Sequence, residues 1–244
     1  MIKWLIEPNY LWMTIMQLLL PVFLYLTIGA EWYWWAFCLL FYFIYLAIGN
    51  NIGMHRYFCH KYFTMSKPME YFVTWSATMA CLGSPLSYAG IHAVHHKHFD
   101  TDLDPHGPIR GQKSVLYCFH KHLSPKDISF TRNLSILAKK YHTLHSYYWP
   151  IVFGNALTIF LLFGWNALLF CWLLPVSLTL WAVAFVLLLQ HDSNGANNSR
   201  LYMWFGWGET WHKNHHDDAS LVNHAPVGKI DYTYQLTRLL AKNE

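Results

Sequence analysis

The sequence predicts an all-α integral membrane protein, with four transmembrane helices in two hairpins and a cytosolic, histidine-rich cap that holds a metal site. The first reason is composition: 55% of the residues are hydrophobic, 18% aromatic and only 12% charged, which is too apolar for an ordinary soluble domain. The second is that all 16 histidines fall outside the longest uncharged segments. We expect a single domain, residues 1–244, because this length is ordinary for one.

Four apolar segments are long enough to cross a bilayer. Residues 8–30 and 32–54 contain no charged side chain, and residues 147–190 form another uncharged stretch that a Gly-Trp-Asn turn divides at 164–166. Roughly 20 helical residues, at about 1.5 Å each, cross about 30 Å of hydrocarbon. We therefore predict spans near residues 10–30, 33–54, 147–163 and 167–190.

Residues 71–91 form a further uncharged run, which we expect not to cross. Gly83, Ser84 and Pro85 interrupt it and leave a helix of roughly 15 residues, too short to span the hydrocarbon. An interfacial or half-buried helix is the better interpretation.

The basic residues predict the orientation. Eleven Lys and Arg residues lie in residues 55–145 and five follow residue 190, against none in the two turns of the hairpins. Because basic loops remain on the cytoplasmic side, residues 55–146 and 191–244 are expected to form the cytosolic cap of a multi-pass membrane protein. No basic patch stands clear of the apolar runs, so no nucleic-acid partner is expected.

The densest chemistry lies at residues 91–106, I-H-A-V-H-H-K-H-F-D-T-D-L-D-P-H. On a helix His92, His95 and His96 are related by i, i+3 and i+4 and project from one face, within reach of a common ion. His98 falls off that face and is expected to be a bystander. Three imidazoles on one face, followed by carboxylates that can hold their outer nitrogens, are typical of a multi-histidine metal site.

The same H-x-x-H-H spacing recurs at residues 212–216, within G-E-T-W-H-K-N-H-H. A polar surface turn would not need this repetition, which favours metal ligands. Neutral imidazoles leave the charge of an ion uncompensated, so nearby carboxylates are candidates to hydrogen-bond the ligands and fix their tautomers. These candidates are Asp100, Asp102, Asp104, Glu209, Asp217 and Asp218.

A third histidine motif, H-R-Y-F-C-H, begins at His55 and ends at His60, where the second span ends. Residues five apart on an α-helix are about 140° apart, so these two are not expected to share a face. They could serve different metal ions or flank a helix end. The five cysteines are scattered without C-x-x-C pairs, which argues against a disulfide framework.

These three motifs in this order, with D-P-H after the second and paired spans on either side, resemble the histidine boxes of the membrane fatty acid desaturases. The resemblance is closest to the stearoyl or Δ9 type, in a bacterial-like subgroup, and covers about residues 40–220. It implies a cytosolic dimetal site holding two iron ions, with O2 as cosubstrate. It also implies electrons from a separate ferredoxin or b-type cytochrome, and a cis double bond introduced into a long acyl chain.

The resemblance implies a set of nine metal ligands and no catalytic residue beyond them. The ligands are His55, His60, His92, His95, His96, His191, His212, His215 and His216. His191 matches a further histidine that the family carries between its last span and third box, although Leu187 stands where the family has an asparagine four residues earlier. His106, in D-P-H, is expected to support a ligand rather than to bind metal.

The acyl carrier stays open between lipid and CoA. Gly90 and Ile91 stand where the animal acyl-CoA enzymes carry an Arg-Asp pair, and the G-S-P-L-S-Y-A-G stretch before them resembles bacterial and cyanobacterial members. The chain is expected to lie in an apolar tunnel lined by the first two spans and residues 70–82. A hydroxylase or related oxygenase on the same scaffold would share every ligand. A haem-binding electron carrier or a zinc protein would belong to a different class.

Overall fold

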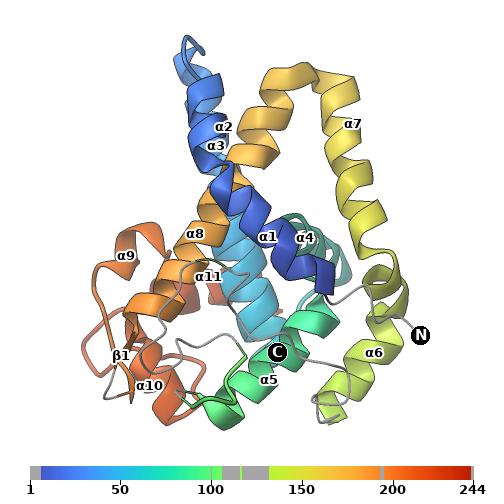
Figure 1. Cartoon of the computed structure of the whole chain (residues 1–244). Coiled ribbons are helices and arrows are strands. Elements are labelled where there is room, and N and C mark those ends of the chain that lie inside the picture. Colours follow the sequence, from blue (N-terminus) through green and yellow to red (C-terminus); the bar gives the residue numbers. More distant parts are fainter. Residues whose placement is uncertain (1–6, 100, 106–115, 117–131, 193–194, 243–244) are drawn as a thin grey trace.

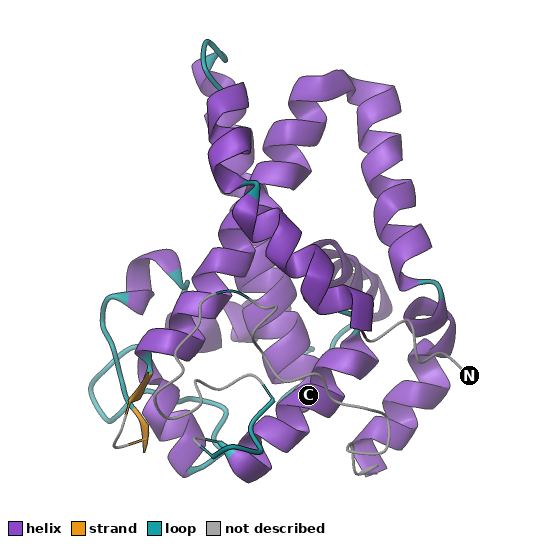
Figure 2. Cartoon of the chain, viewed as in Figure 1, coloured by secondary structure: helices purple, strands orange, loops and turns teal. Residues whose placement is uncertain are grey.

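The computed structural model describes residues 7–99, 101–105, 116, 132–192 and 195–242. Within them the regular secondary structure is helical except for one two-stranded ribbon (Figure 2). The elements in chain order are α1 (Glu7–Leu18), α2 (Leu20–Leu26), α3 (Trp32–Phe43), the π-helix η1 (Ile44–Cys59), α4 (Lys67–Met79), α5 (Pro85–His98), α6 (Arg132–Ser146), α7 (Tyr148–Leu168), η3 (Leu169–Leu173), α8 (Leu174–Leu189), β1 (His191–Asp192), β2 (Gly195–Ala196), α9 (Tyr202–Phe205), η4 (Glu209–Trp211), α10 (His212–Asp217) and α11 (Tyr232–Leu240).

Two helical hairpins project from one end of the molecule, and the shorter helices gather at the other end (Figure 1). Within the described residues, two helical stretches are long and apolar enough to cross a membrane, Trp32–Cys59 and Tyr148–Leu189. The second stretch reverses direction at Gly164, whose φ of 81° lies in the left-handed region that glycine tolerates. The chain therefore turns back where the Gly-Trp-Asn sequence predicted a hairpin.

The first predicted span, residues 10–30, is not a single helix. α1 ends at Leu18 and α2 begins at Leu20, and the two helices meet at an angle (Figure 1). Pro21, in the first turn of α2, has no N–H to bond to the preceding turn and favours a new helix start there. α2 runs beside α3, whereas α1 turns away across the body of the protein.

The uncharged run at residues 71–91 is also divided. α4 ends at Met79, and the turn that follows carries positive φ angles at Cys81 and Gly83. Ser84 then caps α5 by accepting a hydrogen bond from the Ser87 N–H at 3.2 Å. Each of the two helices is too short to cross the hydrocarbon.

α4 packs closely against η1 because glycine removes the side chains at the contact. A Cβ placed on Gly49 would lie 2.6 Å from the carbonyl oxygen of Ser76, and one on Gly53 would lie 2.9 Å from a methyl carbon of Val73. This approach fixes η1, which carries the H-R-Y-F-C-H motif at its end, against the α4 backbone.

Replacing Gly49 with alanine should therefore force η1 away from α4 and destabilise the protein by about 1–3 kcal/mol. Gly154→Ala on α7 is the matched control, because a Cβ there meets no atom within 4 Å. Thermal unfolding of the purified protein in detergent measures both variants. Equal unfolding temperatures for the two would contradict the close packing.

Candidate metal centre

Five of the predicted histidines converge from separate parts of the chain. This five-histidine group comprises His55, His60, His92, His96 and His215. The Nε2 atom of His215 lies 2.9 Å from that of His55 and 2.9 Å from that of His96. The Nε2 atom of His92 lies 3.0 Å from those of His60 and His96. The same ring nitrogen of every member thus faces its neighbours.

The other four predicted histidines form a second group beside the first. This four-histidine group comprises His95, His191, His212 and His216. Its Nε2 atoms are 2.9 Å apart between His191 and His212, 3.1 Å between His212 and His216, and 3.3 Å between His95 and His216. The rings of His96 and His216 stack across the two groups with centroids 4.8 Å apart.

The spacing of these nitrogens fits ligands of common ions. Two nitrogens bound to one ion at about 2.1 Å and at a right angle to each other are about 3.0 Å apart. Hydrogen bonds are a poor explanation, because an Nε2 atom carries either one hydrogen or one lone pair. His92 and His96 each have two Nε2 neighbours, so the linked contacts cannot all be satisfied in this way. Each group could hold a metal ion.

The three histidines of an H-x-x-H-H motif do not meet at one common ion, as their shared helix face suggested. Each motif divides its histidines between the two groups. On α5, His92 and His96 join the five-histidine group while His95 joins the other. On α10 the division is reversed, since His215 alone joins the five-histidine group. Because adjacent residues of one helix serve different groups, the motif itself holds the two groups side by side.

The prediction that His55 and His60 do not share a face is wrong. Their rings lie 4.9 Å apart in one group, because the helix that carries them is a π-helix. Its i→i+5 pattern continues to its end, where the His60 N–H donates to the His55 carbonyl at 3.2 Å. This bonding brings residues five apart onto the same side of the helix.

Burial holds six of these imidazoles neutral at pH 7 by lowering their pKa values. Burial lowers the pKa of His60 to about 3 and that of His96 to about 4. It also lowers the pKa values of His92, His95, His212 and His215 well below their ordinary value. Neutral imidazole is the form that coordinates metal ions, so no proton has to leave before binding.

Comparison with known proteins assigns this arrangement to a family. The model of the family described as Fatty acid desaturase matches residues 30–224, which include both histidine groups. The chain belongs to the fatty acid desaturase family. The resemblance seen in the three histidine motifs is therefore confirmed, as is the prediction of an oxidoreductase.

Three relatives of this desaturase show how far the similarity extends. An sn-1 stearoyl-lipid 9-desaturase of Anabaena variabilis is 27% identical over 243 residues, covering 90% of this chain and 85% of the relative. An sn-2 palmitoyl-lipid 9-desaturase of Nostoc sp. (strain 36) is 28% identical over 253 residues, covering 96% and 88%. Delta-9 acyl-lipid desaturase 1 of Arabidopsis thaliana is 24% identical over 217 residues, covering 80% and 68%.

Two of the predicted carboxylates approach the histidine groups of the desaturase. Both oxygens of Asp104 lie 2.9 Å from Nδ1 of His95, and both side chains are 1% exposed. A proton held on Nδ1 by this carboxylate leaves the Nε2 lone pair facing the four-histidine group. Glu209 Oε1 lies 3.8 Å from Nδ1 of His55, and burial raises the pKa of Glu209 to about 7.

Three of the remaining candidate carboxylates do not approach the histidine groups. Asp102 is exposed, Asp217 pairs with Lys213, and Asp218 accepts hydrogen bonds from Ser220. Asp100 and His106 lie outside the described residues. His98 belongs to neither group, as the helical spacing predicted.

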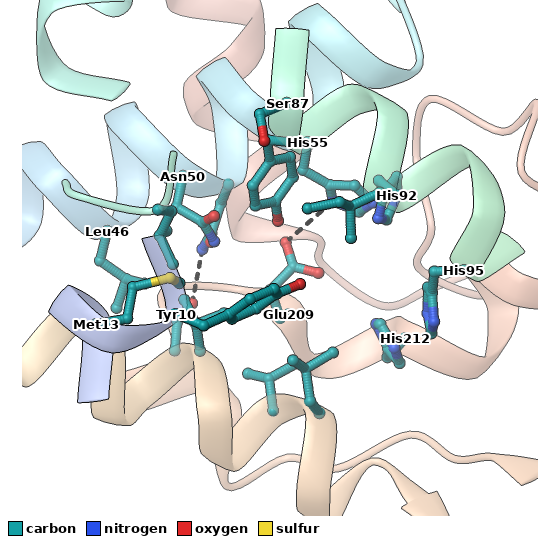
Figure 3. Close-up of a pocket in the computed structure, with 18 residues that line it drawn as sticks. Tyr10, Met13, Leu46, Asn50, His55, Ser87, His92, His95, Glu209 and His212 are labelled. Atoms are coloured by element: carbon teal, nitrogen blue, oxygen red, sulfur yellow. Dashed lines mark hydrogen bonds and ion pairs between the residues drawn. The ribbon is translucent and has the colours of Figure 1, made fainter. Parts of the chain in front are cut away.

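A pocket opens onto both histidine groups (Figure 3). His55 and His92 of one group and His95 and His212 of the other face it. Its remaining walls come from α1, η1, the α4–α5 turn, α5, α8 and the turn before η4. They are Tyr10, Met13, Leu46, Asn50, Asn51, Leu82, Ser87, Tyr88, Ile91, Val183, Val186, Leu187, Gly206 and Glu209. The expected walls omitted α8, and residue 82 is the member of the 70–82 stretch that lines the pocket.

Sequence reasoning missed a buried network behind the five-histidine group. Arg56 is fully buried and donates to Asp231 at 2.8 Å, to Nδ1 of His224 at 3.1 Å and to the Val222 carbonyl at 2.6 Å. The His224 ring lies 4.6 Å from that of His215, a proposed ligand. The network therefore ties the segment after α10 to the residue next to His55. An arginine inside a histidine motif was the available signal, but its partner is far away in sequence.

Asp231→Ala should destabilise the protein by about 3–5 kcal/mol, because it leaves the Arg56 charge buried without its partner. Asp217→Ala is the matched control: it removes an exposed carboxylate from its pair with Lys213 and should cost less than about 1 kcal/mol. Chemical unfolding in detergent micelles would measure both. If Asp231→Ala lowered the free energy of unfolding no more than Asp217→Ala does, the structural role of the Arg56–Asp231 pair would be refuted.

Proposed function

We propose that this chain introduces a cis double bond, near carbon 9, into a long acyl chain carried by a membrane lipid. The observation that carries the proposal is a largely apolar pocket that reaches ligands of both histidine groups. The lipid carrier and the position of the bond are supported by the names of the relatives, which are acyl-lipid 9-desaturases. Gly90 and Ile91, in place of an Arg-Asp pair, agree with a carrier other than CoA.

The nine histidines are the proposed ligands of two iron ions. All nine donors are imidazole nitrogens, which suit iron, copper, nickel or zinc. Five ligands in one group exceed the tetrahedral set of a structural zinc site. The ions would supply the redox chemistry with O2 that removal of two hydrogens from an unactivated chain requires. Electrons would come from a separate ferredoxin or b-type cytochrome.

The pocket residues position the substrate. An acyl chain has no polar handle along its length, so the bond position depends on the distance between a head-group contact and the metal ions. Leu46, Val183 and Val186 line the pocket without polar groups and exclude water from the reacting carbons. Asn51 donates to the Gly206 carbonyl at 2.7 Å and holds η1 to the opposite wall.

The proposed placement is a multi-pass protein with four spans and its histidine groups on the cytoplasmic face. It rests on the charge distribution along the sequence and on the two hairpins, whose tips lie at the opposite end of the molecule from α5 and α10 (Figure 1). Trp32–Cys59 and Tyr148–Leu189 supply the longest apolar stretches. α2 completes the first hairpin beside α3.

Purified protein should contain two irons per chain, and His96→Ala should lower this content and abolish desaturation. Removing one imidazole opens the five-histidine group and displaces the neighbouring ring of His216, which stacks on it. His98→Ala, on the same helix but outside both groups, should keep both irons. Elemental analysis gives the metal content independently of activity. Two irons and full activity in His96→Ala, or zinc alone in active preparations, would disprove the ligand assignment.

Cells expressing the protein with a competent electron donor should gain cis-monounsaturated chains of about sixteen to eighteen carbons, the length that the family implies. Gas chromatography of dimethyl disulfide adducts locates the bond, and lipid-class separation before analysis identifies the carrier. A hydroxylated product would favour the oxygenase alternative. If the new unsaturated chains appeared in acyl-CoA before they appeared in any lipid class, the carrier would be CoA.

Met13→Phe should shift the products towards shorter chains by narrowing the pocket, while leaving the bond at the same distance from the head group. Leu18→Phe is the matched control, because Leu18 is on the same helix but 58% exposed and outside the pocket. The same chromatography compares the two variants. An unchanged chain-length profile in Met13→Phe would contradict the proposed position of the acyl chain in the pocket. So would a double bond whose distance from the head group changes with chain length.

A further inference from the structure

The C-terminal helix α11 buries polar side chains and exposes apolar ones. Thr233 and Thr237 are 1% and 2% exposed, and the Thr233 hydroxyl donates to the Trp207 carbonyl at 2.8 Å. On the outer side, Leu239 is 79% exposed and Tyr232 is 46% exposed. A helix at the surface of a soluble protein shows the opposite pattern. The outer side of α11 therefore suits an apolar environment.

This outer side is part of a larger surface, which we name the C-terminal apolar face. It comprises Val227, Ile230, Tyr232, Leu236 and Leu239. Val227 and Ile230, in the loop before α11, are fully and 55% exposed. Tyr232, Leu236 and Leu239 of the face line a groove, whose other walls are Phe43, Met203, Trp207 and Gln235.

The groove joins the face to the helical stretch Trp32–Cys59, which is long enough to span the membrane. Phe43 is the last residue of α3, and α3 exposes Phe37, Leu39 and Leu40. The apolar surface is thus continuous from the proposed lipid-facing side of α3 to α11. The aromatic rings of Trp207 and Tyr232 lie at the junction, as they do at membrane–water interfaces.

The charged residues from 219 to 242 are basic with one exception. Asp231 is the only acidic residue from 219 to 242, and it is buried against Arg56. Lys229, Arg238 and Lys242 are exposed. Basic residues flanking an apolar surface complement the anionic head groups of the cytoplasmic leaflet.

We propose that the C-terminal apolar face lies in the membrane interface, with α11 along the bilayer surface, its apolar side chains among acyl chains and its basic residues at anionic head groups. This inference rests on the membrane placement proposed above. It changes the expectation that residues 191–244 lie wholly in the cytosol. Because Asp231 caps α11 and pairs with Arg56, next to His55, the seating of α11 would set the height of the histidine groups above the hydrocarbon.

Fluorescence quenching of the full-length protein in nanodiscs tests the proposal. Single cysteines at Leu239 and Val227 would carry an environment-sensitive NBD label, in a background where Cys59 and Cys118 are serine. The nanodiscs would contain phosphatidylcholine and phosphatidylglycerol, with brominated acyl chains as the quencher. Leu39→Cys on α3 is the positive control, and Lys213→Cys on α10, which is exposed, is the negative one.

Labels at residues 227 and 239 should be quenched at least half as strongly as the label at residue 39, and the label at residue 213 should not be. Lys229→Glu with Arg238→Glu should reduce the quenching at residue 239 in anionic nanodiscs more than in neutral ones. Quenching at 39 but not at 227 or 239 would overturn the inference while leaving the membrane placement intact. Absence of quenching at 39 would overturn the placement itself, and the inference with it.

Discussion

The architecture depends on the requirement that nine imidazoles direct the same ring nitrogen towards two neighbouring points. Such a cluster cannot satisfy itself, because lone pairs that face one another in a buried site gain no hydrogen bonds. Two cations would convert this unfavourable contact into coordination, which couples metal binding to the folding of the surrounding segments. The nitrogens on the outer side need partners too, and Asp104 and Tyr62 lie within hydrogen-bonding distance of Nδ1 of His95 and His215.

The buried charge of Arg56, beside the five-histidine group, is balanced by an ion pair rather than by contact with water. Arg56 adjoins His55, and a free guanidinium there would oppose the binding of cations. Asp231 neutralises it at 2.8 Å. Because arginine only donates, Nδ1 of His224 must accept, and the proton of this neutral ring lies on Nε2. Burial lowers the pKa of His224 to about 2, which keeps the ring uncharged beside His215.

The sequence predicted most of the site and less of the backbone that presents it. H-x-x-H-H spacing brings ligands onto one face because α5 and α10 are α-helices. The same rule failed for His55 and His60, since their spacing does not reveal that η1 forms i→i+5 hydrogen bonds. His224 and Asp231 were not identified because they meet Arg56 across separations of 168 and 175 residues. Long-range contacts of single polar residues leave no periodic pattern, whereas repeated motifs do.

The break between α1 and α2 shows how a departure from the predicted span serves the site. A straight helix over residues 10–30 would continue along α3, but the break at Leu19 lets α1 cross the body of the protein (Figure 1). Tyr10 and Met13 of α1 then complete the pocket opposite η1 and the histidines (Figure 3). α8 contributes the facing wall through Val183 and Val186. Residues from both ends of the chain therefore enclose the proposed substrate carbons beside the two histidine groups, where neither hairpin alone could enclose them.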